Sequence, residues 1–381
     1  MENFSFCNPV RVEFGKDKEK NIGKYMSEFE AKKALIIYGS NRIKNSGLFD
    51  VVISSLKENG IEFTVCGGVK SNPVLSKVKE GIEIAKKYGA DSILAVGGGS
   101  VLDSAKAISV GACYDGDVWD FFLGKKPVKA LKIFDIITLA ATGSEMNSGA
   151  VITNEDTLQK YSCISPVMFP KVSVINPELQ KSVSREYLVY SASDVIAHSI
   201  EAYFTAKNRP NLINLQVEAN IKTIMRTTEI LLDKPDDYNA RAEFAWAATM
   251  ALNGLTHLGL GGYSFPNHMI EHAMSAVSDC PHGAGLSVIM PAWMMWYRDN
   301  NIEQFKRFAY EIFGLNEAKD GILALKKWFE KIGTPTKLSE LKIEGEILDE
   351  VKNVAINSTK KYGVTEFYSK KVIDEIFELA K

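Results

Sequence analysis

Four of the five histidines in the sequence are concentrated in two short segments that also contain carboxylates. Asp194 and His198 lie four residues apart in DVIAHS, and a second segment, HMIEHAMSAVSDCPHG, contains His268, His272 and His282. Neutral imidazole is the commonest protein ligand for borderline transition metals. One aspartate and three histidines can bind a single divalent ion and leave a position open for a substrate oxygen. The sequence therefore predicts a metal site.

Both segments have the spacing of helices that carry their polar residues on one face. Asp194 and His198 are related as i and i+4, so their side chains share a helix face. The three residues between them are apolar, and a buried carboxylate requires a partner such as a cation. His268 and His272 share a face in the same way. His257 fits no such pattern, and we interpret it as a structural or exposed residue.

The segment from His268 to His272 also reads H-x-x-E-H, which is the signature of the inverzincin peptidases. In that alternative both histidines bind zinc and Glu271 is the general base. The peptidase hypothesis is remote, because it leaves Asp194, His198 and the glycine-containing loops without a role.

A glycine-rich turn joins an apolar run to a helical stretch in SILAVGGGSVLDSAKAI. Gly97, Gly98 and Gly99 allow the backbone to turn sharply and to approach a ligand closely. A helix that begins behind them presents unpaired N–H groups and a positive dipole end, which suits a pyrophosphate. Ser100 and Asp103 have the spacing of an S-x-x-D capping pair. The alternative is a plain strand-to-helix turn with a capped helix.

A second polar loop, TLAATGSEMNSG, also follows an apolar run and offers Thr138, Ser144 and Asn147 as donors. Taken alone, it is equally typical of a solvated surface loop. Two such loops at the carboxyl ends of parallel strands favour a shared ligand crevice.

A third strand end, in YGSNRIKNSG, consists of Gly39, Ser40, Asn41 and Arg42. It lacks the acidic residue that binds the adenosine ribose hydroxyls in many dinucleotide-binding folds. Small donors beside a guanidinium favour a phosphate, so the segment predicts NADP(H) in preference to NAD(H). The alternative is an ordinary turn that carries a basic residue.

Length and composition place these sites in an ordinary globular protein. With 381 residues and 42.2 kDa, the chain is long enough for two domains. A net charge of −2 provides no field that would recruit nucleic acid or an anionic membrane. Five scattered cysteines without a CxxC indicate a reducing compartment, and no apolar run approaches the ~18 residues of a membrane span. We therefore expect a cytoplasmic protein.

The apolar pattern changes character about half-way along the chain. Short apolar runs at 34–38, 62–66, 92–96, 133–139 and 172–175 alternate with helical stretches. This alternation predicts an α/β nucleotide-binding domain with a mostly parallel, Rossmann-like sheet over residues 1–183. After Pro177 the apolar residues recur only with helical period, which predicts an all-α helical-bundle domain over residues 184–381. The histidine segments fall in this second domain.

Several of these segments are similar to those of a known family. GGGSVLDSAKA, TLAATGSEMN, DVIAHSIE and HMIEHAMSAVSDCPHGAGL resemble the iron-dependent (group III) alcohol dehydrogenases, over nearly the whole chain. YGSNRIKNSG and the SNP at 71–73 resemble the butanol dehydrogenase and broad aldehyde reductase branch. The resemblance implies NADP(H)-linked hydride transfer between short primary alcohols and aldehydes, such as butanol and butanal, with the metal as Lewis acid. It also implies a homodimer.

The resemblance assigns roles to individual positions of this sequence. It implies that the metal ligands are Asp194, His198, His268 and His282. It places His272 near the nicotinamide and the substrate, where we expect a catalytic role in proton transfer. The implied cofactor contacts are Gly98, Gly99, Ser100, Asp103, Thr138, Asn147, Lys160 and Leu179, together with Gly39 where NAD-specific members carry aspartate. The ligand types do not distinguish Fe, Zn, Co and Ni.

Two other interpretations remain open at the level of sequence. One is a glycerol- or polyol-type dehydrogenase, or a dehydroquinate synthase-like enzyme, of the same superfamily. Such enzymes need basic residues that face the metal, and the metal-binding segments offer little lysine or arginine. The other is a protein that binds metal and nucleotide without catalysis.

Overall fold

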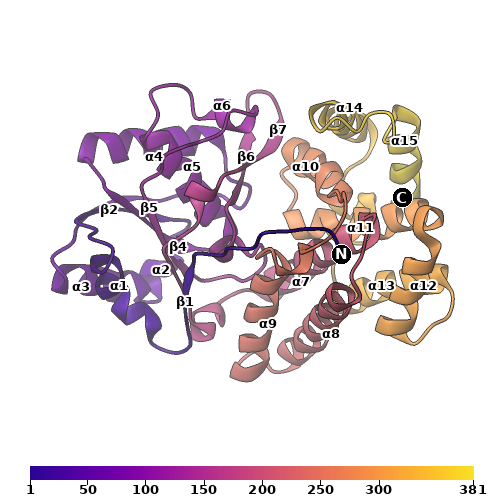
Figure 1. Cartoon of the computed structure of the whole chain (residues 1–381), viewed down its shortest axis with the longest axis horizontal. Helices are drawn as coiled ribbons and strands as arrows, with labels where there is room; N and C mark the ends of the chain where they lie inside the picture. Colours follow the sequence, from indigo (N-terminus) through magenta and orange to yellow (C-terminus); the bar gives the residue numbers. More distant parts are fainter. The chain divides into compact units, whose positions relative to one another are not determined.

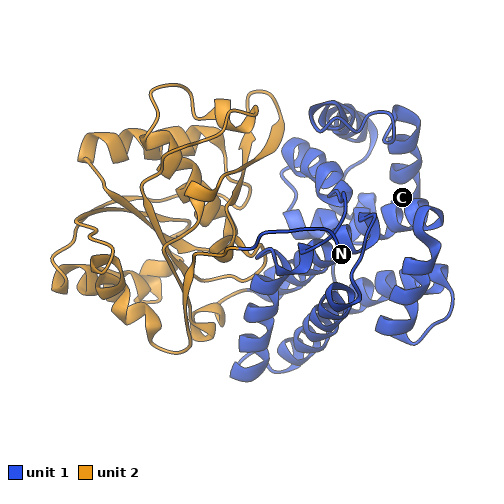
Figure 2. Ribbon diagram, in the orientation of Figure 1, with its two compact units in different colours: residues 1–6, 184–381 blue, residues 7–183 orange.

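The computed structural model describes all residues from 1 to 381, and the chain divides into two compact units. One unit contains residues 7–183, and the other contains residues 1–6 and 184–381 (Figure 2). The first residues join the second unit because the backbone N–H of Glu2 donates to the carbonyl of Gly259. None of the helices combines the length and apolar composition that a membrane span requires.

Residues 7–183 are built around a six-stranded parallel sheet, which confirms the predicted fold class. Its strands are β1 (Arg11–Phe14), β2 (Lys33–Tyr38), β3 (Glu62–Cys66), β4 (Ser92–Gly97), β5 (Lys132–Ile137) and β8 (Val172–Ile175). They lie in the order β1-β8-β5-β4-β2-β3. The inner strands β4, β5 and β8 are almost entirely buried, which explains their continuous apolar sequences.

Helices cover both faces of this sheet. They are α1 (Ile22–Ser27), α2 (Arg42–Asn45), α3 (Leu48–Glu58), α4 (Leu75–Tyr88), α5 (Gly99–Ala112) and α6 (Trp119–Phe122). Residues of α1 and α3 such as Met26 and Val52 share one core with Ile36, Leu94 and Phe134 of the strands. Helices α4 and α5 lie on the opposite face of the sheet (Figure 1).

The strand order brings the three predicted loops to one edge of the sheet. Tyr38 at the end of β2 pairs with Val96 of β4, and Gly97 at the end of β4 pairs with Ile137 of β5. The loops that follow these strands therefore leave the sheet side by side. The chain continues outward from β2 to β3 and then returns to β4, so the topological switch point lies between β2 and β4. Ligands of parallel α/β sheets bind at such a point.

A β-hairpin that was not predicted from the sequence follows the second loop. Strands β6 (Gly149–Asn154) and β7 (Gln159–Ile164) pair antiparallel and form a separate two-stranded sheet. Partly buried and buried residues alternate over the first four residues of β6, where Ala150 and Ile152 are buried. This alternation and the polar turn between the strands are the ordinary signal of a hairpin. The signal was weak because each strand mixes polar and apolar residues.

The second unit is helical after residue 184, as predicted. Its helices are α7 (Arg185–Thr205), α8 (Asn211–Asp233), α9 (Tyr238–Ala251), α10 (Pro266–Ser278), α11 (His282–Tyr297), α12 (Ile302–Phe313), α13 (Ala318–Ile332), α14 (Gly345–Lys361) and α15 (Lys370–Leu379). Helix α7 begins after Ser184, whose side chain accepts a hydrogen bond from the backbone of Tyr187. Its residues from Ser191 to Phe204 are all buried, so α7 lies at the centre of the bundle.

Candidate active site

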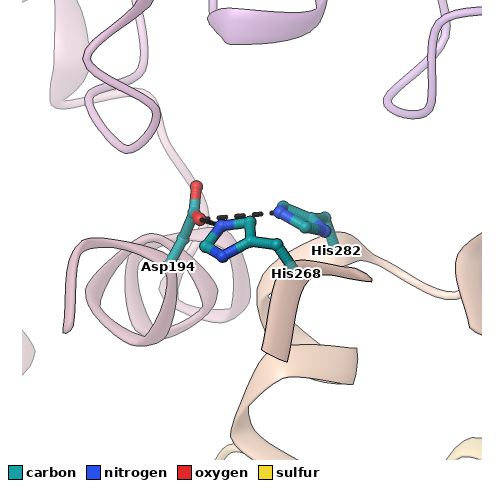
Figure 3. Close-up of side chains that lie close together, drawn as sticks. All are labelled: Asp194, His268 and His282. Carbon is teal, nitrogen blue, oxygen red and sulfur yellow. Dashed lines mark ion pairs between the residues drawn. The ribbon is translucent and has the colours of Figure 1, made fainter. Parts of the chain in front are cut away.

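The predicted metal ligands converge on one carboxylate oxygen in the helical unit. Asp194 and His198 come from α7, His268 comes from α10, and His282 is the first residue of α11. The Nε2 atoms of His198, His268 and His282 lie 3.6, 3.5 and 3.6 Å from Oδ1 of Asp194. Figure 3 shows the side chains of Asp194, His268 and His282 directed toward one another.

The distances between these atoms suit a bound cation better than direct hydrogen bonds. Oδ1 of Asp194 and Nε2 of His268 are buried and have no hydrogen-bond partner. Ligands held tetrahedrally at roughly 2.1 Å from one ion are about 3.4 Å apart, which is close to the observed spacing. Unpaired buried polar atoms are costly, so the convergence of these atoms suits a bound cation. The ligand atoms of Asp194, His268 and His282 all lie within 4.8 Å of one another and fit a divalent metal ion, and Nε2 of His198 approaches the same carboxylate oxygen.

Two buried glutamates orient the imidazole rings of this site. Nδ1 of His268 lies 2.9 Å from a carboxylate oxygen of Glu201, which also accepts the backbone N–H of the same histidine. Nδ1 of His282 hydrogen-bonds to the carboxylate of Glu271. Both glutamates are completely buried. A carboxylate that binds Nδ1 fixes the tautomer that exposes Nε2 to a metal, so Glu201 and Glu271 present their histidines as ligands.

The pKa shifts at this site follow from burial and from the interactions between the carboxylates and the imidazoles. Burial lowers the pKa of His198 to about 3, against the attraction of Asp194, so this imidazole is neutral as a metal ligand must be. Burial also opposes the charge of His268, but the carboxylates of Glu201 and Asp194 outweigh it and raise the pKa of His268 to about 10. Burial is likewise overcome at Asp194, where the three imidazoles lower the pKa. The carboxylates of Glu201 and Asp194 thus favour a positive charge beside His268, which a metal ion would supply in place of the imidazole proton.

Close helix packing holds the ligands together. A Cβ at Gly283 would overlap the backbone carbonyl of Tyr190, so only glycine allows α11 to approach α7 at this point. A Cβ at Gly285 would lie 2.8 Å from Cγ of Glu271. Helices α7 and α11 carry three of the four candidate ligands, and these glycines therefore set the ligand spacing.

His272 lies beside the candidate ligands but does not point at the same atom. Its ring centroid is 6.1 Å from that of His268 and 5.5 Å from that of His282. A second group, formed by Glu271, His272 and His282, also brings possible ligand atoms within 4.8 Å of one another. Glu271 already accepts from Nδ1 of His282, so the Asp194 cluster is the more consistent metal centre.

In the sheet unit, the glycine-rich turn packs directly against the second loop. A Cβ on Gly99 would overlap the side chain of Thr142, and one on Gly98 would lie 3.2 Å from Cβ of Leu139. Neither glycine has a positive φ. The absence of side chains is therefore required by the neighbouring loop, in addition to any ligand that approaches the turn.

The predicted capping pair at the start of α5 is wrong. The helix begins after Gly98 without a side-chain cap, and the Ser100 hydroxyl donates instead to the carbonyl of Ser71. Asp103 is turned inward, where its carboxylate accepts from the Ser144 hydroxyl at 2.7 Å and from the Val151 N–H at 2.9 Å. The start of α5 thus has no side-chain cap, which suits an anion site.

Several predicted cofactor contacts also take part in contacts within the protein. Asn147 accepts from Gly149 N–H at 2.9 Å and donates to the Gly143 carbonyl at 2.9 Å. Lys160 is buried and donates to Oδ1 of Asn72 at 3.0 Å. Leu179 packs against the core formed by the sheet with α1 and α3. The backbone N–H of Thr138 donates to Gly97, which joins the two loops.

The segment after β2 carries two cations and no carboxylate. Ser40, Asn41 and Arg42 are exposed, and the Arg42 guanidinium donates to the Ser182 carbonyl at 3.1 Å. The ammonium of Lys44 lies 5.1 Å from the ring centroid of Tyr38. Gly39 accepts from Gly68 N–H, and a Cβ at Gly39 would lie 3.3 Å from the Val69 carbonyl.

Comparison with known proteins agrees with this arrangement. The family model for iron-containing alcohol dehydrogenase matches residues 9–177, and the model for the C-terminal region of the same family matches residues 188–381. The chain therefore belongs to the iron-containing alcohol dehydrogenase family.

Members of this family with butanol dehydrogenase and aldehyde reductase names are similar over almost their full length. The chain is 37% identical to the probable NADH-dependent butanol dehydrogenase 1 of Bacillus subtilis over 93% of this chain and 94% of that protein. It is 29% identical to the NADPH-dependent aldehyde reductase YqhD of Escherichia coli over 91% and 90%. The crystal structure of NADH-dependent butanol dehydrogenase A from Thermotoga maritima superposes with a TM-score of 0.97 at 44% identity, covering 100% and 99% of the two chains.

As an iron-containing alcohol dehydrogenase, the protein is an NAD(P)-dependent oxidoreductase that uses a divalent metal and acts on small alcohols or aldehydes. The peptidase alternative is wrong, because Glu271 is a hydrogen-bond partner of His282 in a protein of another family. His257 is partly buried and stacks on Tyr263 with a centroid distance of 5.1 Å, which agrees with a structural role.

The orienting role of Glu201 and Glu271 was not predicted from the sequence. A signal for Glu201 was available, because it is seven residues after Asp194 and so lies on the same face of α7. No comparable signal connects Glu271 with His282, since the two residues lie on different helices.

Proposed function

We propose that the protein is a metal-dependent, NADP(H)-linked alcohol dehydrogenase and aldehyde reductase for short primary alcohols and aldehydes such as butanol and butanal. The observation that carries this proposal is the convergence of three imidazole Nε2 atoms on Oδ1 of Asp194. We further propose that Asp194, His198, His268 and His282 are the ligands.

The chemistry divides between the bound groups and the chain's own residues. A divalent ion held by these ligands would supply Lewis-acid polarisation of the substrate oxygen. The nicotinamide would supply or accept the hydride. Glu201 and Glu271 keep the Nε2 atoms of His268 and His282 aimed at the ion. We assign to His272, whose ring centroid lies 5.5 Å from that of His282, the transfer of a proton through water to or from the substrate oxygen.

Preference for NADP(H) rests on the segment from Gly39 to Arg42. This segment offers small donors and a guanidinium, to which the structure adds the ammonium of Lys44. A ribose 2′-phosphate would find two cations there and no competing carboxylate. The named butanol dehydrogenase relatives are NADH-dependent and the aldehyde reductase is NADPH-dependent, so the preference needs a direct measurement.

The test is the initial rate of butanal reduction by metal-loaded protein, with NADPH and NADH compared in parallel. We expect turnover with a higher kcat/KM for NADPH. The Gly39→Asp variant should reverse this preference, since a carboxylate repels the 2′-phosphate and accepts from ribose hydroxyls. Faster reaction with NADH would contradict the cofactor proposal alone. Absence of butanal turnover, with activity on glycerol or another polyol, would favour the polyol-type alternative.

His268→Ala provides the control for the metal. The variant should lose both turnover and metal affinity, because it removes one ligand and leaves Glu201 without its imidazole partner. Aldehyde reduction that persisted without bound metal would refute the Lewis-acid mechanism.

A further inference from the structure

Lys106 on helix α5 is completely buried, although lysine is almost never fully buried unless it is paired. Its Nζ lies 2.7 and 2.8 Å from the carbonyl and hydroxyl oxygens of Ser144. It also lies 2.9 and 3.0 Å from the carbonyl and side-chain oxygens of Asn147, and 2.9 Å from the carbonyl of Gly149. All five oxygens belong to the second loop. The loop therefore folds around the ammonium.

Asp103, one helical turn earlier, makes one more contact with this loop and one with strand β6, which follows it. Its carboxylate accepts from the Ser144 hydroxyl and from the backbone N–H of Val151. Ser144 is thus bound by both charged side chains. Together with the packing of Gly98 and Gly99 against the loop, these contacts fix it along the first two turns of α5.

The electrostatics of this cage indicate a charged lysine at neutral pH. Burial lowers the pKa of Lys106 to about 8, while Asp103, Asp135 and Glu145 favour its charged form. Replacing a buried charge with an apolar residue of similar volume is often neutral for stability, so stability alone does not explain Lys106. The hydrogen bonds from its ammonium to the loop oxygens specify one loop conformation, and an apolar side chain could not make them.

We propose that Lys106, assisted by Asp103, is a positioning residue for the nicotinamide cofactor, holding residues 144–149 in the binding conformation before the cofactor arrives. The inference rests on the proposed function, specifically on cofactor binding at Gly98–Ser100. That turn packs on Leu139 and Thr142 of the second loop, so displacement of the loop also displaces the turn. Preorganised binding segments raise affinity because less ordering remains when the ligand binds.

Lys106→Met tests this proposal, with Ser109→Ala as the matched control. Methionine has a comparable length but cannot bind the five oxygens. Ser109 is also completely buried on α5, but its hydroxyl donates to Leu131, outside the second loop. Binding of NADP+ and NAD+ to the full-length, metal-loaded proteins would be measured by calorimetry. If the loop is competent about one-tenth of the time without Lys106, the Kd rises roughly tenfold.

Kinetics and hydrogen exchange distinguish positioning from loss of stability. In Lys106→Met we expect the KM for the cofactor to rise about tenfold while kcat at saturating cofactor stays within twofold. Amides of residues 143–149 should exchange faster without cofactor and regain protection when it binds. Ser109→Ala should leave all three readouts unchanged.

A milder variant covers the case in which Lys106→Met does not fold. Ser144→Ala removes a hydroxyl bound to both Lys106 and Asp103, and it should raise the Kd for the cofactor severalfold. If Lys106→Met folds and its Kd for the cofactor is unchanged, the positioning role is wrong while the proposed function stands. If Lys106→Met does not fold, an unchanged Kd in Ser144→Ala has the same meaning. Wild-type protein that binds neither NADP+ nor NAD+ would overturn the proposed function, and the inference with it.

Discussion

The orienting role of Glu271 leads to a graded prediction for metal affinity. Replacing it with glutamine removes the negative charge but leaves an amide oxygen that can accept from Nδ1 of His282. Replacing it with alanine removes the hydrogen-bond acceptor of Nδ1 of His282 altogether. Partners of this kind typically contribute 10–100-fold to metal affinity. We therefore expect about tenfold weaker binding for Glu271→Gln and about a hundredfold for Glu271→Ala.

These factors correspond to about 1.4 and 2.8 kcal/mol of binding free energy. The geometry supports placing Glu271→Gln and Glu271→Ala at opposite ends of this range of metal affinity. Glu271 is completely buried and accepts from Nδ1 of His282, which is the most exposed of the three candidate imidazole ligands. His282 therefore depends on Glu271 for its orientation.

The assay is titration of metal-free protein with Co2+, followed by visible absorption and by competition with a chelator. Glu218→Gln is the matched control, since Glu218 is another buried carboxylate of the helical unit but binds Arg307 and Tyr203. The control should lose stability and keep its metal affinity. Equal Co2+ affinity in wild type, Glu271→Gln and Glu271→Ala would refute the orienting role, whatever their activities.

Three other predictions concern packing, metal removal and thiol chemistry. Gly283→Ala should destabilise the protein by about 1–3 kcal/mol, measured by urea unfolding, because the new methyl overlaps the Tyr190 carbonyl; unchanged stability would refute this close contact. Chelation should lower Tm, and metal at 100 times its Kd should restore about 2.7 kcal/mol; a Tm insensitive to metal would contradict a site in the folded helical unit. At pH 8 the exposed Cys7 should react rapidly with a thiol reagent, whereas Cys66 and Cys163, whose pKa burial raises to about 11, should react only on unfolding; loss of the fast phase in Cys7→Ser would check the assignment.

The sequence was sufficient for features that depend on local spacing. Parallel strands covered on both faces are continuous apolar runs, and helices are periodic, so the change from sheet to bundle near residue 184 was predictable. The i, i+4 relation of Asp194 and His198 places two donors on one helix face regardless of the rest of the fold. The loops after β2, β4 and β5 could be expected to lie close together, because the carboxyl ends of parallel strands meet at a common edge of the sheet.

Only the tertiary structure decided which groups meet across elements. Lys106 lies on helix α5 and Ser144 lies in the second loop, 38 residues later, so no periodicity in the sequence connects them. The S-x-x-D spacing of Ser100 and Asp103 predicted a local cap, yet burial beside the second loop gives Asp103 other partners. A side-chain hydrogen bond is made or lost when the distance between donor and acceptor changes by a few tenths of an ångström. The packing of helices and loops fixes these distances, as the close contact of Gly283 with Tyr190 illustrates. Sequence spacing therefore determined which residues could act, and packing determined which of them act together.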